Sequence, residues 1–198
     1  MIFLRSKPFL RPANFCRGFA FFLLITGAWT CRGKDQGEKT GIPTHHADIT
    51  YENGEGKSRT VTLPDGSKVE MTPHTVVRIS KEFNKSERDL ELDGEALFTV
   101  GTDVGKPFVV HTKNLQIQVL SGGQFKVEAF EKNAGEEADL LSGKLQVKKS
   151  YHSDTDNEPE ILEAGQMVMI NRDIDLMEKE KLDSAELKSL QERFQVLK

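Results

Sequence analysis

The chain has 198 residues, of which 37% are hydrophobic, 29% charged and 8% aromatic, and its formal net charge is −4 at pH 7. This length is enough for one domain with a buried core and leaves little room for a second. The high charged fraction and the scarcity of aromatic residues argue against a bundle of membrane-spanning helices and indicate a soluble globular body.

Residues 1–31 have the composition of an export signal. Their charged residues are all basic, and they are Arg5, Lys7, Arg11 and Arg17. An apolar run, Gly18–Thr30, follows them. At ~1.5 Å per residue this run would cover about 20 Å as a helix, which is less than the roughly 30 Å hydrocarbon core of a membrane. A basic start followed by a short apolar run is typical of a signal for export.

Cys31 follows this run at the position where a bacterial lipoprotein carries its lipidated cysteine. The preceding residues, Ala28-Trp29-Thr30, fit the processing site of a lipoprotein only loosely. Three interpretations therefore stay open: a lipoprotein anchored through Cys31, a signal cleaved near Ala28, or an uncleaved signal anchor. Each places the body of the chain outside the cytoplasm, in the periplasm, and the first and third hold it at the membrane.

The body that follows is acidic and has no pair of thiols. Both cysteines, Cys16 and Cys31, lie in the N-terminal segment, so no disulfide is expected within the body. Without the four basic residues of that segment, 23 Lys and Arg remain against 31 Asp and Glu, a net charge of −8. An acidic body is a poor match for phosphate backbones, and we do not expect nucleic acid as a partner.

Residues 32–57 are rich in Gly, Lys, Glu, Asp and Thr and are expected to form a flexible tether. From Arg59 onward, short segments alternate apolar and polar residues and end at Gly or Pro, which predicts strands. The predicted strands are 59–63, 67–71, 75–80, 88–92, 95–100, 107–112, 115–120, 124–130, 137–141, 144–149 and 166–170. Because no helical segment separates them, we expect an all-β, antiparallel sandwich or roll.

A glycine recurs between these predicted strands. The stretches are PDGSKV (64–69), LDGEA (92–96), LSGKL (141–145) and EAGQM (163–167). Gly after Asp or Ser supplies the positive φ of a tight hairpin turn. We therefore expect Asp93-Gly94 to reverse the chain, Glu95 to begin the next strand, and Arg88 to form an ion pair with Glu95.

Residues 172–198 are predicted to form a C-terminal tail that ends in one amphipathic helix. Asp183 and Glu186 have the spacing of a capping box. The apolar stripe of the helix consists of Leu187, Leu190, Phe194 and Leu197. We expect this stripe to pack on the sheet or, alternatively, on a neighbouring protein. The polar stretch 152–160 is expected to be an exposed loop.

The histidines and Ser121 do not have the spacing of a catalytic or metal site. The five histidines are His45, His46, His74, His111 and His152. They lack the spacing of zinc ligands, and His111 is expected to be a solvated strand residue. Ser121 precedes Gly122-Gly123, but a nucleophile elbow requires a strand followed by a helix, whereas two strands are predicted here. A hairpin turn or a bulge is the simpler interpretation.

The carboxylates and aromatic residues also give no clear evidence of a catalytic pair or a sugar-binding surface. Glu91, Asp93 and Glu95 cannot be counted as a glycosidase pair without geometry. Sugar-binding sandwiches need exposed aromatic platforms, and most phenylalanines of the body are placed as core residues. We therefore predict no catalytic residue, no metal site and no cofactor, and we expect that the protein is not an enzyme.

A series of short motifs runs through residues 58–171. They are VTLPDGS (61–67), RDLELDGEALFTV (88–100), KPFVV (106–110), FKV (125–127), GKLQV (143–147) and LEAGQ (162–166). In this order the motifs resemble the central periplasmic domain of the FecR family. The residues that the resemblance marks as structural are Pro64, Asp65, Gly66, Arg88, Gly94, Glu95, Phe98, Pro107, Phe108, Phe125, Gly143 and Gly165.

The resemblance implies a non-catalytic, extracytoplasmic β domain with a jelly-roll-like sandwich. Full-length members of the family are inner-membrane regulators. Their cytoplasmic N-terminal part binds an extracytoplasmic-function sigma factor, and their periplasmic part receives a signal from a TonB-dependent transporter. By this resemblance the partner of the present chain is an envelope protein, either a transporter or a regulator.

The chain also departs from the family pattern. Only 17 residues precede the apolar run, too few for the sigma-binding helices, and a helix replaces the small receptor-contacting domain that usually follows. The stretch Ser121-Gly122-Gly123-Gln124 is one residue longer than the corresponding family turn. We therefore expect a stand-alone FecR-type domain that binds another envelope protein. The alternative is a structural or assembly lipoprotein without a signalling role.

Overall fold

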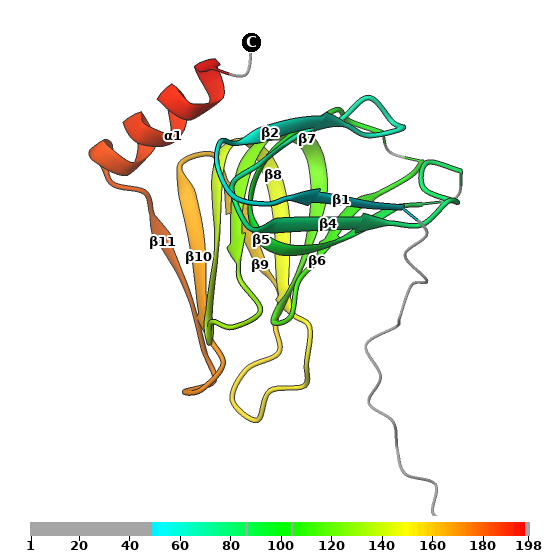
Figure 1. Ribbon diagram of the computed structural model, residues 1–198. Coiled ribbons are helices and arrows are strands. Elements are labelled where there is room, and N and C mark those ends of the chain that lie inside the picture. Colours follow the sequence, from blue (N-terminus) through cyan, green and yellow to red (C-terminus); the bar gives the residue numbers. More distant parts are fainter. Residues whose placement is uncertain (1–48, 86, 104, 197–198) are drawn as a thin grey trace, which may run out of the picture. The chain divides into compact units, whose positions relative to one another are not determined.

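The computed structural model describes residues 49–85, 87–103 and 105–196 (Figure 1). The elements, in chain order, are β1 (Ile49–Asn53), β2 (Arg59–Thr62), β3 (Lys68–Met71), β4 (Thr75–Ile79), β5 (Arg88–Val100), β6 (Phe108–His111), β7 (Leu115–Ala129), β8 (Gly135–Lys149), β9 (Glu160–Glu163), β10 (Gln166–Asn171), β11 (Leu176–Lys181) and α1 (Ser184–Val196). The predicted all-β class with one C-terminal helix is thus confirmed. The predicted export segment, residues 1–31, lies outside the described residues.

Three long strands, β5, β7 and β8, run through both halves of the sheet, so that the first part of each pairs with one set of strands and the second part with another. The first half of β5 pairs with β4 and β6, and its second half pairs with β3 and β7. In the same way β7 pairs first with β6 and then with β5, while β8 pairs first with β10 and then with β9. The eleven strands therefore form one sheet that curls around the main core, while a smaller buried cluster lies on its outer face.

The curvature of β5 brings its two ends close together. A straight strand of 13 residues would span about 40 Å. Yet the side chain of Arg88, the first residue of β5, donates a hydrogen bond at 3.3 Å to the carbonyl oxygen of Gly101, just beyond its last residue. The chain can therefore return through a short loop and place β6 parallel to the start of β5. This parallel pair departs from the predicted, purely antiparallel order.

The glycines at positions 94 and 143 lie inside strands and not at the predicted turns. Gly94 has φ +122° in the middle of β5, and Gly143 has φ +98° in the middle of β8. At both positions the neighbouring backbone is so close that a Cβ would lie 2.6 Å from it, on Thr75 and Gly122 respectively. Glycine permits these bends because it alone combines positive φ with such close approach. The predicted reversals at Asp93-Gly94 and at Gly143 are therefore wrong.

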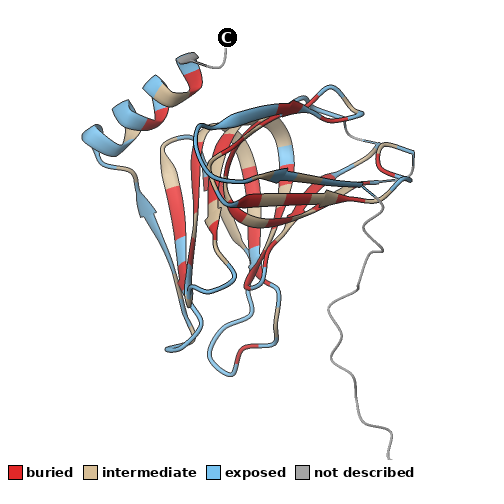
Figure 2. Cartoon of the chain, in the orientation of Figure 1, coloured by how far each residue is buried: buried red, intermediate tan, exposed pale blue. Residues whose placement is uncertain are grey.

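Alternating apolar residues of the strands fill the core, as the sequence pattern indicates. Figure 2 shows buried residues alternating with less buried ones along the long strands. The core includes residues of β2 to β10, and Phe98, Phe108 and Phe125 are among its largest fully buried side chains. The outward-facing residues of the same strands are left to form the surface.

Three strands occupy segments that were expected to lack them. β1 lies in the predicted tether and pairs with β4, and β11 lies in the predicted C-terminal tail and pairs with β10. β9 begins at the end of the predicted 152–160 loop and pairs with β8. These strands are short or strongly charged, so their patterns are weak. The remaining part of the tether, 32–48, lies outside the described residues.

The capping box at the start of α1 is confirmed. The N–H of Asp183 donates to Glu186 Oε2 at 2.8 Å, and the N–H of Glu186 donates to Asp183 Oδ1 at 2.8 Å. Within the described residues α1 is the single helix of the chain, and it is not long and apolar enough to span a membrane.

Candidate functional site

A buried ion pair joins separate segments of the chain at the start of β5. Arg88 Nη1 lies 3.1 Å from Asp65 Oδ2, and the two side chains are only 5% and 4% exposed. Arg88 Nε also donates to the carbonyl oxygen of Lys106 at 2.7 Å. The guanidinium lies 5.5 Å from the centre of the Phe108 ring. A buried charge is tolerated when it is paired and hydrogen-bonded, so this cluster fastens the β2–β3 turn to β5 and to the loop before β6.

Three further motif residues surround this pair. Pro64 and Gly66 flank Asp65 in the turn between β2 and β3, where the N–H of Gly66 donates to the carbonyl of Leu63 at 2.9 Å. The carbonyl oxygen of Pro107 accepts the backbone N–H of Arg88 at 3.3 Å. The structure thus brings together motifs that are far apart in the sequence.

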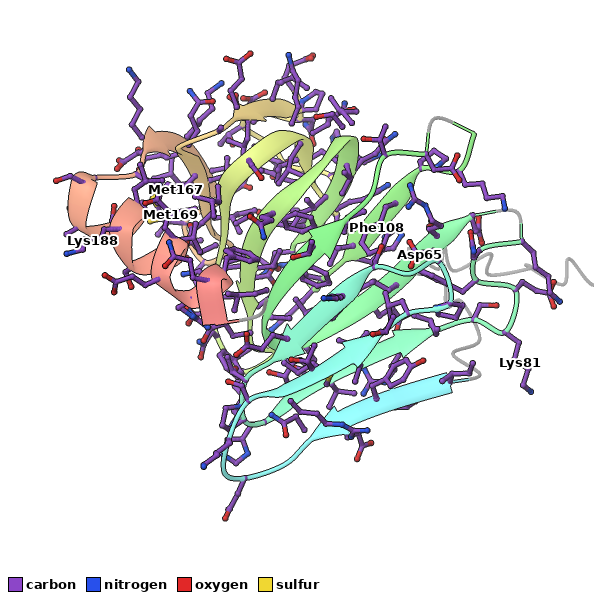
Figure 3. All side chains as sticks on the ribbon, turned by 90° about the horizontal axis from the view of Figure 1, so that it is seen from above. Asp65, Lys81, Phe108, Met167, Met169 and Lys188 are labelled. Atoms are coloured by element: carbon purple, nitrogen blue, oxygen red, sulfur yellow. The ribbon has the colours of Figure 1, made fainter. Side chains whose placement is uncertain are left out.

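The aromatic motif residues continue this cluster into the core. Phe98 lies edge-on to Phe108, with ring centres 6.3 Å apart, and stacks on Phe125 at 4.9 Å. Figure 3 labels Phe108 and Asp65, which lie near one another on the side of the sheet away from α1. Gly165 lies apart from this group, in the turn between β9 and β10, as predicted.

The predicted ion pair between Arg88 and Glu95 is wrong. Arg88 pairs with Asp65, while Glu95 Oε1 lies 2.6 Å from Nη1 of Arg193 on α1. The bend at Gly94 is held by Thr75, whose hydroxyl accepts the N–H of Glu95 and donates to its carbonyl oxygen, both at 3.0 Å. Glu95 therefore belongs to the outer face of the sheet, where it binds the helix.

One cluster superficially resembles a serine nucleophile with a lysine. Lys149 Nζ donates to Ser153 Oγ at 2.8 Å, and Ser153 Oγ donates to Asp175 Oδ2 at 2.7 Å. Hydrogen bonds from Ser153 and Lys149 hold the pKa of Asp175 well below its usual range. A lysine that donates to a carboxylate cannot take a proton from serine, and Ser153 is buried. The cluster anchors the loop after β8 to the β10–β11 turn.

The described histidines give no metal site. His111 Nε2 lies 2.9 Å from Asp89 Oδ2 on the neighbouring strand, so His111 is a half-buried paired residue and not the solvated one expected. Across residues 49–85, 87–103 and 105–196, no three His, Cys, Asp or Glu side chains are grouped as metal ligands.

Two parallel rows of side chains cross the outer face of β5, β7, β8, β10 and β11. Strand register puts Leu97, Lys126, Asp139, Met167 and Glu180 in the first row, and Glu95, Glu128, Glu137, Met169 and Glu178 in the second. Glutamates directly oppose one another on β5, β7 and β8. Like charges in direct opposition destabilise a sheet unless cations lie beside them, and here Arg193 pairs with Glu95 and Lys126 with Glu137.

The helix α1 covers part of the first row. Leu190 and Phe194 are buried against Leu97, and Arg193 forms the ion pair with Glu95. In Figure 3, Met167 and Met169 lie beside α1. Of the two alternatives for the apolar stripe, the structure shows packing on the sheet for Leu190 and Phe194, whereas Leu197 lies outside the described residues. The outer face therefore already holds one amphipathic helix through apolar contacts and a basic side chain.

A polar cleft of about 340 Å³ lies between α1 and the sheet. Lys126 Nζ at its floor is 2.8 Å from both Glu137 Oε1 and Asp139 Oδ2. Asp139 is buried, and its second oxygen, Oδ1, has no hydrogen-bond partner among the described residues. Burial raises the pKa of Asp139 to about 6 although Lys126 opposes this shift. Burial alone would lower the pKa of Lys126, but its bonds to Asp139 and Glu137 outweigh burial and raise it.

A wider hollow of about 400 Å³ continues along the same face. Met169, Ile174 and Leu176 line it and are unusually exposed for large apolar residues, at 36%, 66% and 42%. Glu137 lines both the hollow and the cleft. We call the cleft, the hollow and the second row together the outer groove.

Comparison with known families identifies the domain. Residues 49–146, from β1 into β8, match the family model described as FecR, FecR protein. The chain carries a FecR domain. The match begins before the predicted limit at residue 58 because β1 belongs to it, and it ends before the last three strands. The Arg88 cluster lies wholly inside the matched FecR residues.

Solved structures support the same assignment. Two crystal structures of a proposed anti-sigma factor from Parabacteroides distasonis ATCC 8503 are similar to the chain, at 29% and 28% identity. Each has a TM-score of 0.62, and the similarity covers 71% of this chain and 63% of the other chain. The similar region thus spans less than two thirds of the relative. A comparison with curated proteins gives no match.

The residues of the outer groove were missed in the sequence. Lys126 and Asp139 alternate with core residues of the FecR domain, so their outward direction is predictable. Their contact depends on the register between β7 and β8, which shifts at irregularities between Val119 and Phe125. The sequence alone therefore does not indicate that Lys126 and Asp139 contact each other.

The raised pKa of Asp139 predicts a pH dependence of stability. The ordinary value is 3.8 and the folded value is about 6, so the folded FecR domain binds this proton more tightly than the unfolded chain does. The stability contributed by the protonated carboxyl is present below about pH 4 and is lost as the pH rises through 6. As the pH rises from 4 to 7, we expect wild type to lose about 2 kcal/mol more of its free energy of unfolding than Asp139→Asn does, because asparagine has no proton to lose.

Urea unfolding of wild type and Asp139→Asn at several pH values between 4 and 7 measures this difference. Asp173→Asn, in the exposed β10–β11 turn, is the control and should run parallel to wild type. A constant difference between Asp139→Asn and wild type across this range would show that Asp139 does not titrate there.

Proposed function

We propose that the chain is a non-enzymatic, extracytoplasmic FecR-type regulator that acts by binding another protein of the bacterial envelope. The observation that carries this proposal is the FecR match over residues 49–146. The similar proteins of solved structure, proposed anti-sigma factors, support a role in the control of a sigma factor.

The location rests on the N-terminal sequence. The basic start, the apolar run and Cys31 together support export followed by attachment to the membrane, with Cys31 as the site of lipidation. A single lipid chain gives only weak membrane binding, so stable anchoring would need the additional chains that lipoproteins carry. In this arrangement the FecR domain faces the periplasm on its tether.

Deletion of the gene in its native host tests the regulatory role. We expect severalfold changes in the transcripts controlled by one extracytoplasmic-function sigma factor, and their restoration by the wild-type gene. The Cys31→Ala chain should move from the membrane fraction to the soluble fraction and restore the transcripts poorly. Unchanged transcripts together with a leaky envelope would contradict regulation and support the structural alternative.

A further inference from the structure

The outer groove combines apolar exposure with unbalanced negative charge. Met169, Ile174 and Leu176 account for three of the five large hydrophobic residues that are exposed in the described part of the chain. They lie beside the glutamates of the second row, and Glu128, Glu137 and Glu178 line the same hollow. An exposed apolar patch with a charged rim is typical of a surface that another molecule covers.

The charges of the outer groove indicate what kind of molecule would bind there. Glu128 is directly opposite Glu137 on β8 and opposite Glu95 on β5. Glu95 and Glu137 are compensated by Arg193 and Lys126, respectively. A lysine or arginine from outside would relieve the repulsion that remains around Glu128.

The helix α1 shows how such an occupant is held. It is amphipathic, buries Leu190 and Phe194, and places Arg193 on a glutamate of the second row. Cleft and hollow are neighbours along the strands, since Met167 and Met169 are two residues apart on β10, about 7 Å. A second helix can therefore lie beside α1 on the same face.

We propose that the outer groove binds a basic amphipathic helix of a partner protein. Apolar side chains of that helix contact Met169, Ile174 and Leu176, and its lysine or arginine side chains bind Glu128, Glu137 and Glu178. The proposal rests on the protein-binding function above and specifies its partner as a cationic helix. It adds the contact surface, which the family match does not define.

A pair of synthetic peptides tests this assignment. One is an amphipathic helix of Leu and Lys, and the other carries Glu at every Lys position; both bear a fluorophore for anisotropy. The protein is the full chain in nanodiscs of neutral phosphatidylcholine, and empty nanodiscs give the lipid background. We expect wild type to bind the Lys peptide at least about tenfold more tightly than the Glu peptide.

Two exposed substitutions on β11 and one distant control give the decisive comparison. Glu178→Lys and Leu176→Ser should each weaken binding of the Lys peptide about fivefold or more, with unchanged circular dichroism. Glu55→Lys makes the same charge change in the exposed β1–β2 connection and should leave binding unchanged. Equal weakening by Glu55→Lys and Glu178→Lys, or no preference for the Lys peptide, overturns the proposal.

The same variants also test whether the outer groove binds something other than a partner helix. A dimer in sedimentation velocity that Leu176→Ser abolishes would assign the groove to a second copy of the chain. Binding to anionic vesicles that Leu176→Ser abolishes would assign it to lipid. Either result overturns a partner helix. If the gene deletion changes the transcripts but Glu178→Lys restores them fully, the groove inference fails while the proposed function stands.

Discussion

Arg88→Met is expected to lower the free energy of unfolding by about 3–5 kcal/mol, the largest effect of the substitutions considered. Methionine fills much of the volume of arginine, so the loss does not come from a cavity. It comes from Asp65, whose nearly buried carboxylate would lose its cation. The carbonyl oxygens of Lys106 and Gly101 would also lose a donor. Urea unfolding followed by circular dichroism measures the change.

Two further variants test whether the buried, unpaired charge causes the loss of stability. Lys85→Met removes an ion pair with Glu82 whose side chains are 66% and 63% exposed, and it should cost less than about 1 kcal/mol. Adding Asp65→Asn to Arg88→Met removes the unpaired charge, so the double variant should be more stable than Arg88→Met alone. The ion-pair explanation would be contradicted if Arg88→Met cost no more than Lys85→Met.

Gly94→Ala is expected to destabilise the fold by about 2–4 kcal/mol. Two causes add together. The backbone has φ +122°, which alanine rarely adopts, and the new Cβ would lie 2.6 Å from the Cα and Oγ1 of Thr75. Movement of Thr75 would also disturb its two hydrogen bonds to Glu95, so the bend in β5 cannot relax at no cost.

Gly54→Ala is the matched control for this substitution. A Cβ at Gly54 would have no neighbour within 4 Å, and its φ lies outside the positive region. We expect a change within about 0.5 kcal/mol. Thermal unfolding of both variants under the same conditions provides the comparison, and equal melting temperatures would refute the role assigned to Gly94.

The sequence predicts the core better than it predicts the course of the chain. Alternation places Phe98, Phe108 and Phe125 inside because neighbouring strand residues face opposite sides. It cannot distinguish Gly94 from Gly66, since positive φ serves both a bend within a strand and a turn between strands. The deciding fact is the close approach of Thr75, which belongs to another strand and has no local signal.

The candidate site was less predictable than the fold. The motif resemblance marked Arg88 and Asp65 but gave no reason for either, and the presence of Arg88 and Glu95 in the same motif led to the wrong pairing. The outer groove depends on the pairing of β8 with β10 and of β10 with β11. β11 in particular reads as a charged tail, so the face that it completes could not be recognised from composition.

The passage of β5, β7 and β8 through both halves of the sheet has a consequence for how the molecule opens. Neither half can lose its strand pairing without pulling on the other, so the body should unfold as one cooperative unit. By contrast, β11 pairs with β10 alone, and α1 follows it. These last elements can separate locally while the rest stays folded, and a molecule bound in the outer groove would suppress that local opening.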